Sequence, residues 1–177
     1  MLTFEEIYAT LPSTGWLYES EARLLWESIN STQGDILEVG SYHGRSTVLL
    51  AATGRAVHAV DPFDNFDSDD PTGDSTYKKF MDNVFHSRCL MNVHLHRKKV
   101  EEWFPTTRFG FAYLDGDHTY EGTLLQIEKA TDVGAKVCCI HDYAQTGGGV
   151  NVVKAIERAG LTVVRVVERM AWCRCLE

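Results

Sequence analysis

The sequence lacks any hydrophobic run that approaches the ~20 residues needed to cross a bilayer. It also lacks a basic start, since Glu5 and Glu6 occupy positions where a secretory signal carries positive charge. We therefore expect a protein without a membrane span or secretory signal, located in the cytoplasm.

Basic residues are scarce: 17 Lys and Arg against 25 Asp and Glu give a formal net charge of -8. Affinity for nucleic acids depends on clustered basic side chains. The one basic run, Arg97-Lys98-Lys99, is followed by two glutamates and indicates a solvated loop. The composition therefore argues against a nucleic-acid partner.

Paired cysteine motifs are also missing. The five cysteines form an odd set without the C-x-x-C spacing of zinc ribbons and redox motifs. Cys138 and Cys139 lie inside an apolar run, where cysteine behaves as a small core residue. At 177 residues the chain is long enough to bury a core without disulfides or structural metal.

No repeat, low-complexity tract or linker interrupts the chain, which predicts one domain over residues 1–177 with an N-terminal helical segment at 1–33. Short apolar runs alternate with longer amphipathic ones, a pattern typical of a parallel sheet covered by helices. Strands are expected at 36–39, 56–60, 92–96, 111–114 and 136–140. Helices are expected at 19–31, 46–52, 77–85, 120–132 and 150–159.

The C-terminal stretch has a different pattern. Leu161–Val167 and Met170–Cys175 are two extended runs separated only by Glu168-Arg169, which predicts a tight antiparallel hairpin. The expected fold is therefore an α/β, Rossmann-like three-layer sandwich. Its seven-stranded sheet is mostly parallel and closes with this hairpin.

A glycine-bearing turn follows the first expected strand. Ligands of open parallel sheets bind beyond the carboxyl ends of strands, where small residues such as Gly40 and Gly44 let a ligand approach the backbone. The second strand ends in Asp61, 21 residues after Gly40, at the position where an acidic side chain accepts hydrogen bonds from ribose hydroxyls. The alternative is that Asp61-Pro62 is only a turn.

The turn is not a G-x-G-x-x-G motif, because Tyr42 and His43 crowd the space between its two glycines. Such crowding argues against a pyrophosphate at the helix N-terminus. S-adenosylmethionine carries no phosphate, so the pattern favours that cofactor over NAD. An NAD-linked oxidoreductase stays as an alternative.

Three motifs carry a family resemblance. Residues 36–47, Asp61-Pro62-Phe63 and residues 113–122 resemble the class I S-adenosylmethionine-dependent methyltransferases. They are most similar to the small family that includes the macrocin-type sugar O-methyltransferases. The resemblance extends from Gly15-Trp16-Leu17 to the final hairpin, which is how class I methyltransferases complete their sheet.

The resemblance implies a set of cofactor contacts. It places the methionine part beside the turn, the ribose at Asp61 and the adenine near Lys99 to Glu101. The implied cofactor residues are Glu38, Gly40, Ser41, Tyr42, Gly44, Ser46, Asp61, Pro62, Phe63, Lys99, Val100 and Asp115.

Asp115 and Asp142 fall at the expected ends of the fourth and fifth strands. If these strands are neighbours, about 4.8 Å apart, the two carboxylates can share a divalent cation. In sugar-methylating relatives two adjacent acidic residues stand on the fifth strand, whereas this chain has His141-Asp142. Imidazole is a poor ligand for magnesium and a better one for transition metals. The expected ligands of Mg2+ or Mn2+ are Asp115, Asp142 and His141. The alternatives are an enzyme that uses no metal, or aspartates that only stabilise the turns after the two strands.

Methyl transfer to a hydroxyl needs aligned partners and a base. Asp117 and His118 follow Asp115 directly and are the first candidates for the general base, with His141 as a third. Structural roles compete with each assignment: His118 as a cover for the cofactor, Asp117 as a helix N-cap, and His141 as a strand-end histidine.

Residues 64–76 hold five aspartates together with a proline and a glycine. We interpret them as a lid over the acceptor side, with an ordinary surface loop as the alternative. A lid of this charge would disfavour phosphorylated acceptors and tolerate neutral or cationic ones.

The resulting hypothesis is an S-adenosylmethionine-dependent O-methyltransferase for a small hydroxylated acceptor, with sugar-like molecules among the candidates. The alternative from another class is a cofactor-binding module or inactive subunit. The sequence does not specify the acceptor or the oligomeric state.

Overall fold

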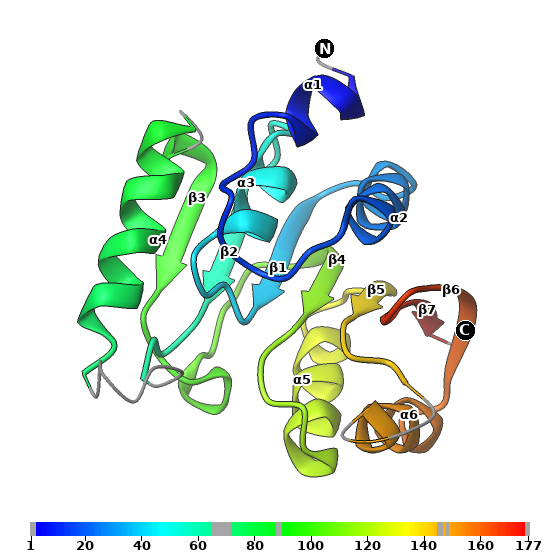
Figure 1. Ribbon diagram of the computed structural model, residues 1–177. Helices are drawn as coiled ribbons and strands as arrows, with labels where there is room; N and C mark the ends of the chain where they lie inside the picture. Colours follow the sequence, from blue (N-terminus) through cyan, green and yellow to red (C-terminus); the bar gives the residue numbers. More distant parts are fainter. Residues whose placement is uncertain (1–2, 65–71, 88–89, 145–146, 148, 176–177) are drawn as a thin grey trace.

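The protein is built around one seven-stranded sheet (Figure 1). The computed structural model describes residues 3–64, 72–87, 90–144, 147 and 149–175. The strands lie in the order β3-β2-β1-β4-β5-β7-β6, and all neighbours are parallel except β7, which is antiparallel to β5 and β6. The strands are β1 (Asp35–Val39), β2 (Val57–Val60), β3 (Val93–His96), β4 (Phe109–Leu114), β5 (Val137–Ile140), β6 (Leu161–Val167) and β7 (Met170–Cys175). The predicted fold class is confirmed.

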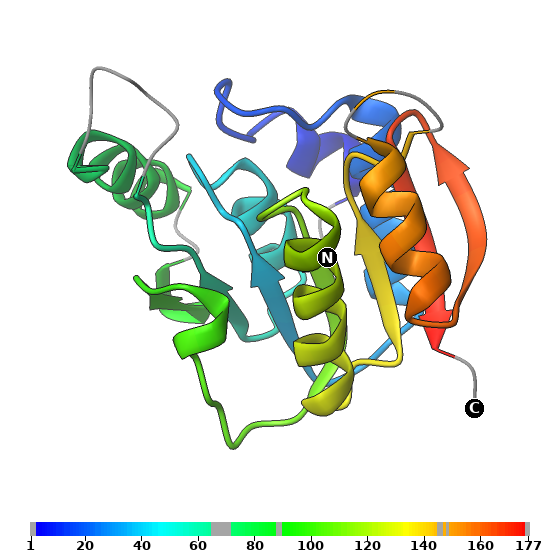
Figure 2. The same cartoon turned by 90° about the horizontal axis from the view of Figure 1, so that it is seen from below.

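Helices cover both faces of the sheet, so that the molecule has three layers (Figure 2). They are α1 (Phe4–Tyr8), α2 (Glu19–Asn30), α3 (Arg45–Ala51), α4 (Asp74–His86), α5 (Tyr120–Asp132) and α6 (Gly149–Arg158), with short 3-10 turns η1 (Leu90–Asn92) and η2 (Val100–Glu102). Side chains alternate across each strand. Ile36 therefore packs in the core under α2, α3 and α4, while Leu37 packs in the core under α5 and α6.

The structure adds detail at two helix starts. α1 lies within the helical segment expected at 1–33; it begins with a capping box in which Glu6 N–H donates to Thr3 Oγ1 and Thr3 N–H donates to the Glu6 carboxylate. α4 begins at Asp74 rather than Tyr77, because Gly73 precedes it in the left-handed conformation (φ +67°). The first turn of α4 therefore occupies part of the expected lid at 64–76, and residues 65–71 of that lid lie outside the described part of the chain.

The carboxyl ends of β1, β2, β4 and β5 lie side by side. Val39 pairs with Val60 and with Leu114, and Leu114 pairs with Ile140. Backbone hydrogen bonds continue one residue further, from Asp115 N–H to Val39 O and from His141 N–H to Leu114 O. Gly40, Asp61, Asp115 and His141 therefore emerge at one edge of the sheet, as ligand-binding residues of such sheets do.

Cys138 and Cys139 lie in the core, 4% and 0% exposed, as predicted. Within the described ranges, none of the helices has the length and apolar character that a membrane crossing requires.

Candidate active site

The side chain of Glu38 stabilises the turn that follows β1. This carboxylate is completely buried and accepts hydrogen bonds from the hydroxyls of Ser41 (2.9 Å), Ser46 (2.6 Å) and Thr47 (2.5 Å). Burial raises the pKa of Glu38 to about 7, against the effect of these hydrogen bonds. Glu38 was expected to contact the cofactor; its side chain holds the hydroxyls of the turn and is not among the residues that line the cavity described below.

Asp61 joins the same turn to the end of β2. Its carboxylate accepts hydrogen bonds from the backbone N–H groups of Ser41 (2.7 Å), Tyr42 (2.9 Å) and Phe63 (2.7 Å). Asp61 thus holds two strand ends together, and it also lines the cavity described below.

The two glycines of the turn are needed for contacts within the protein. A Cβ atom on Gly40 (φ +83°) would lie 2.2 Å from the carbonyl oxygen of Asp115, so only glycine lets the ends of β1 and β4 approach so closely. Gly44 (φ +80°) precedes α3, and a Cβ atom there would meet the ring of Phe80 at 3.1 Å. Gly44 does not line the cavity, in contrast to the expected cofactor contact.

Among the described residues, four with a side chain adopt left-handed backbone conformations. Glu168 (φ +50°) lies in the β6–β7 turn, and the other three follow β1, β2 and β5: Tyr42 (φ +46°), Phe63 (φ +55°) and Asp142 (φ +56°). Such conformations are costly for residues with a side chain and cluster at functional sites. All three line the same cavity.

This cavity has a volume of about 1130 Å³. Pockets for one small ligand usually span about 300–1,000 Å³, so there is room for a cofactor and an acceptor together. The structure brings most of the expected cofactor residues into its lining, namely Gly40, Ser41, Tyr42, Ser46, Asp61, Pro62, Phe63, Lys99, Val100 and Asp115.

Asp115 is the centre of an ionic network on the cavity wall. Its Oδ1 lies 3.2 Å from Nε2 of His118 and 3.2 Å from Nδ1 of His141, and its Oδ2 accepts a hydrogen bond from the hydroxyl of Tyr113 (2.9 Å). Burial raises the pKa of the Asp115 carboxyl, but the hydrogen bonds from the two histidines outweigh it and hold the pKa at about 2. Asp115 is therefore ionised.

His118 lies between two carboxylates. Its Nδ1 is 2.7 Å from Oδ2 of Asp142, whose Oδ1 is 2.6 Å from the guanidinium of Arg169. Burial lowers the pKa of His118, but the hydrogen bond and charge of Asp115 and the charge of Asp142 outweigh it and raise the pKa above its usual value. About a third of its side chain is exposed, within the cavity lining.

His141 is buried between Asp115 and Glu21. Its Nε2 lies 3.4 Å from Glu21, a completely buried carboxylate that also accepts hydrogen bonds from the backbone N–H groups of Tyr18 and Arg169 (3.1 Å each). Burial lowers the pKa of His141, but its close contacts with the carboxylates of Asp115 and Glu21 outweigh burial and raise the pKa to about 10. A pKa this high favours the protonated form of His141 at neutral pH, and the role of His141 as a general base stays a prediction.

These side chains do not fit the expected divalent-cation site. The carboxylates of Asp115 and Asp142 are bridged by the imidazole of His118, and protonated His141 has no lone pair to offer a metal. Among the described residues, no three His, Cys, Asp or Glu side chains are arranged to hold a metal ion. The imidazoles of His118 and His141 thus contact the carboxylates that were expected to bind Mg2+ or Mn2+.

Asp117 is exposed, and its carboxylate accepts a hydrogen bond from the N–H of Thr119 (2.8 Å), which forms an Asx-turn. The N-cap of α5 is Thr119, whose hydroxyl accepts from Gly122 N–H. Asp117 lines the cavity but takes part in a local turn, whereas His118 belongs to the ionic network.

Residues 37–143, more than half of the chain, match the protein family described as "Methyltransferase domain". The chain belongs to this methyltransferase family. No curated protein sequence matches it.

Many solved structures have the same fold as this chain. The O-methyltransferase TomG from Streptomyces achromogenes, involved in tomaymycin synthesis and solved with S-adenosylmethionine, has a TM-score of 0.70 at 12% identity, over 98% of this chain and 89% of that one. An O-methyltransferase from Bacillus cereus in complex with S-adenosylhomocysteine has a TM-score of 0.66 at 15% identity, over 97% and 90%. A TDP-rhamnose 3'-O-methyltransferase of calicheamicin biosynthesis has a TM-score of 0.61 at 18% identity, over 86% and 77%.

Several residues of the methyltransferase site were missed by the sequence analysis. Glu21 and Arg169 complete the ionic network, and Trp16 and Tyr18 line the cavity. Glu21 lies in an amphipathic helix, where a single glutamate has the pattern of a solvated residue. The available signal was Trp16, because the Gly15-Trp16-Leu17 motif belongs to the family resemblance.

Proposed function

We propose that this methyltransferase uses S-adenosylmethionine to methylate a hydroxyl group of a small acceptor, with His118 as the general base. The observation that carries the proposal is a single cavity in which the turn after β1, Asp61 and His118 meet. The bound S-adenosylmethionine and S-adenosylhomocysteine of two structures with this fold support the choice of cofactor.

The cofactor would lie across the carboxyl ends of β1 and β2. The turn at Gly40 to Tyr42 faces the methionine part, and Asp61 is placed for the ribose, with carboxylate lone pairs left beside its three backbone hydrogen bonds. Lys99 and Val100 line the same cavity on the side expected for adenine. When bound, S-adenosylmethionine supplies an electrophilic methyl group on a sulfonium.

His118 would accept the proton of the acceptor hydroxyl as its oxygen bonds to the methyl carbon and the carbon–sulfur bond breaks. Asp142 orients the imidazole through Nδ1, and Asp142 and Asp115 together stabilise the imidazolium that forms. The high pKa of His141 favours its protonated form, which keeps Asp115 ionised, so His118 is the better candidate for the base.

Calorimetric titration with S-adenosylhomocysteine tests the cofactor, and turnover on a panel of phenols and glycosides tests the base. His118→Ala is expected to lower turnover by about 10²–10⁴-fold, the usual worth of a general base, with unchanged product affinity. His86→Ala, at an exposed histidine at the end of α4, is the matched control and keeps full turnover. If S-adenosylhomocysteine does not bind to the wild type, the cofactor assignment is wrong. If His118→Ala keeps full turnover, His118 is not the general base.

A further inference from the structure

Two large aromatic side chains are exposed at the cavity. Trp16 and Tyr18 are 71% and 63% exposed, and both line the cavity. By contrast, Trp103 in the core is 4% exposed. Exposed rings forgo the favourable burial of a large apolar surface, which a bound ligand can supply.

The segment that carries these rings is held in place. Leu17 between them is buried in the core, and its carbonyl oxygen accepts a hydrogen bond from Nε of Arg45 (3.2 Å). The backbone N–H of Tyr18 donates to Glu21, and the ring of Trp16 stacks on Tyr42 with 5.2 Å between centroids. The rings are therefore presented in a fixed position, which lowers the entropic cost of binding a ligand against them.

The charges beside the rings are already balanced within the protein. Asp142 pairs with His118 and Arg169, and Asp115 pairs with His118 and His141. An ionic acceptor would have to break one of these pairs, so the arrangement favours an uncharged acceptor. A flat ring matches the stacking geometry that aromatic side chains prefer.

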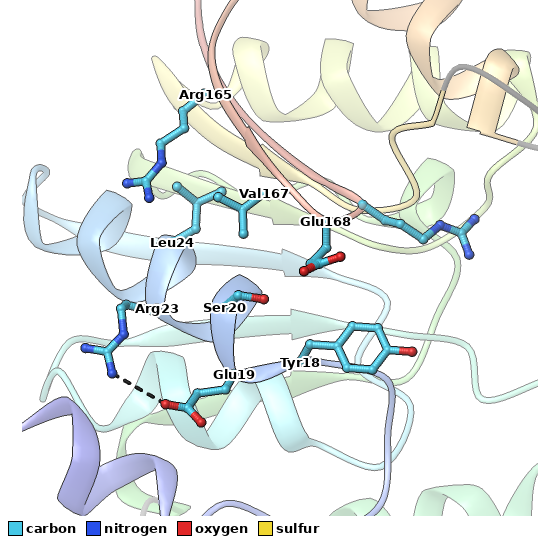
Figure 3. Close-up of a pocket in the computed structure, with 9 residues that line it drawn as sticks. Tyr18, Glu19, Ser20, Arg23, Leu24, Arg165, Val167 and Glu168 are labelled. Carbon is cyan, nitrogen blue, oxygen red and sulfur yellow. Dashed lines mark ion pairs between the residues drawn. The ribbon is translucent and has the colours of Figure 1, made fainter.

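There is also space on the far side of Tyr18. A second cavity of about 840 Å³ lies between the start of α2 and the β6–β7 hairpin, and Tyr18 and Arg169 line both cavities (Figure 3). Figure 3 shows the ring of Tyr18 at one end of this second cavity, with Arg23 and Arg165 at the other. A ring bound against Tyr18 thus has room for a substituent.

We propose that Trp16 and Tyr18 form the acceptor subsite, and that the acceptor is an uncharged, hydroxylated ring with one apolar face. Phenols and pyranosides share this chemistry. The inference rests on the proposed function, because it assigns a place in the same cavity to the acceptor of the proposed reaction.

The test uses the indole N–H signals of the four tryptophans in a ¹H–¹⁵N spectrum of the protein saturated with S-adenosylhomocysteine. Trp16→Phe identifies the signal of Trp16. Catechol and methyl rhamnopyranoside are then titrated separately, up to about 20 mM. We expect one of them to shift the Trp16 signal saturably; catechol doing so identifies a phenol acceptor, and the rhamnoside identifies a sugar.

Affinity variants complete the test. Trp16→Ala is expected to lower the affinity for the probe that shifts the Trp16 signal by about tenfold. Trp16→Phe retains most of this affinity because it keeps an aromatic ring. Phe85→Ala is the control, since Phe85 is 66% exposed but does not line the cavity. An unchanged melting temperature of each variant shows that it is folded.

The inference is overturned if neither probe moves the Trp16 signal, or if Trp16→Ala binds the active probe as tightly as the wild type. These results differ from failure of the proposed function, in which S-adenosylhomocysteine itself does not bind.

Discussion

Replacing Gly40 by alanine tests the contact that joins the two halves of the site. The new Cβ atom would meet the Asp115 carbonyl oxygen at 2.2 Å and the Gly116 nitrogen at 2.7 Å, both rigid backbone atoms. Overpacking of this kind costs about 1–3 kcal/mol. The left-handed conformation (φ +83°) costs a residue with a side chain about 1–2 kcal/mol in addition.

Gly54→Ala measures the cost of the left-handed conformation alone, because Gly54 has nearly the same φ (+79°) and nothing lies within 4 Å of its Cβ position. The difference between the variants is then the packing cost alone. At about 2–4 °C per kcal/mol for a chain of this size, Gly40→Ala should melt about 2–12 °C below Gly54→Ala. The affinity for S-adenosylhomocysteine, measured by calorimetry, should fall only in Gly40→Ala, because the new Cβ atom forces the ends of β1 and β4 apart. Equal melting temperatures for the two variants would refute the close approach of β1 and β4.

Three further predictions concern charge. Turnover should rise with pH through the pKa of His118, which lies above 6.5, because the base must be neutral; a pH-rate profile without this limb contradicts the assignment. The pKa of Glu38 is about 7 in the folded protein and 4.5 in the unfolded chain. Its contribution of about 3 kcal/mol to the free energy of unfolding is therefore present below pH 4.5 and is lost as the pH rises to about 7. Urea unfolding at several pH values should show that the free energy of unfolding of Glu38→Gln lacks this dependence on pH, and an equal dependence in the wild type and the variant would refute the prediction. Dialysis against a chelator should leave turnover unchanged, because His141 already pairs with Asp115 and Arg169 already pairs with Asp142; loss of activity restored by Mg2+ or Mn2+ would show otherwise.

Features with a local cause were predictable from the sequence. The hairpin strands Leu161–Val167 and Met170–Cys175 have the expected bounds, because only two turn residues separate two extended runs. The sequence left open whether the fourth and fifth strands are neighbours; in the structure β4 and β5 do pair, with Leu114 opposite Ile140. The hairpin was predictable because its pattern lies within a few residues of each strand.

Features that depend on tertiary contacts were not predictable. Glu21 belongs to the site only because α2 packs against the end of β5 and the β6–β7 hairpin, which are more than a hundred residues away along the chain. The charge of His141 has the same origin, since it depends on Glu21 being buried beside it. A strand-end histidine followed by an aspartate suits a metal ligand as well as an ion pair, and only the contacts of the folded chain distinguish the two.

The order of the last strands in the sheet has a consequence for how the protein is made. β7 is synthesised after β5 and β6, yet it lies between them in the sheet. A nascent chain that has reached β6 therefore still carries an open apolar edge along β5, which invites pairing with other nascent chains. Arg169 stands directly before β7, so the ion pair between Arg169 and Asp142 forms only when this part of the chain has been synthesised.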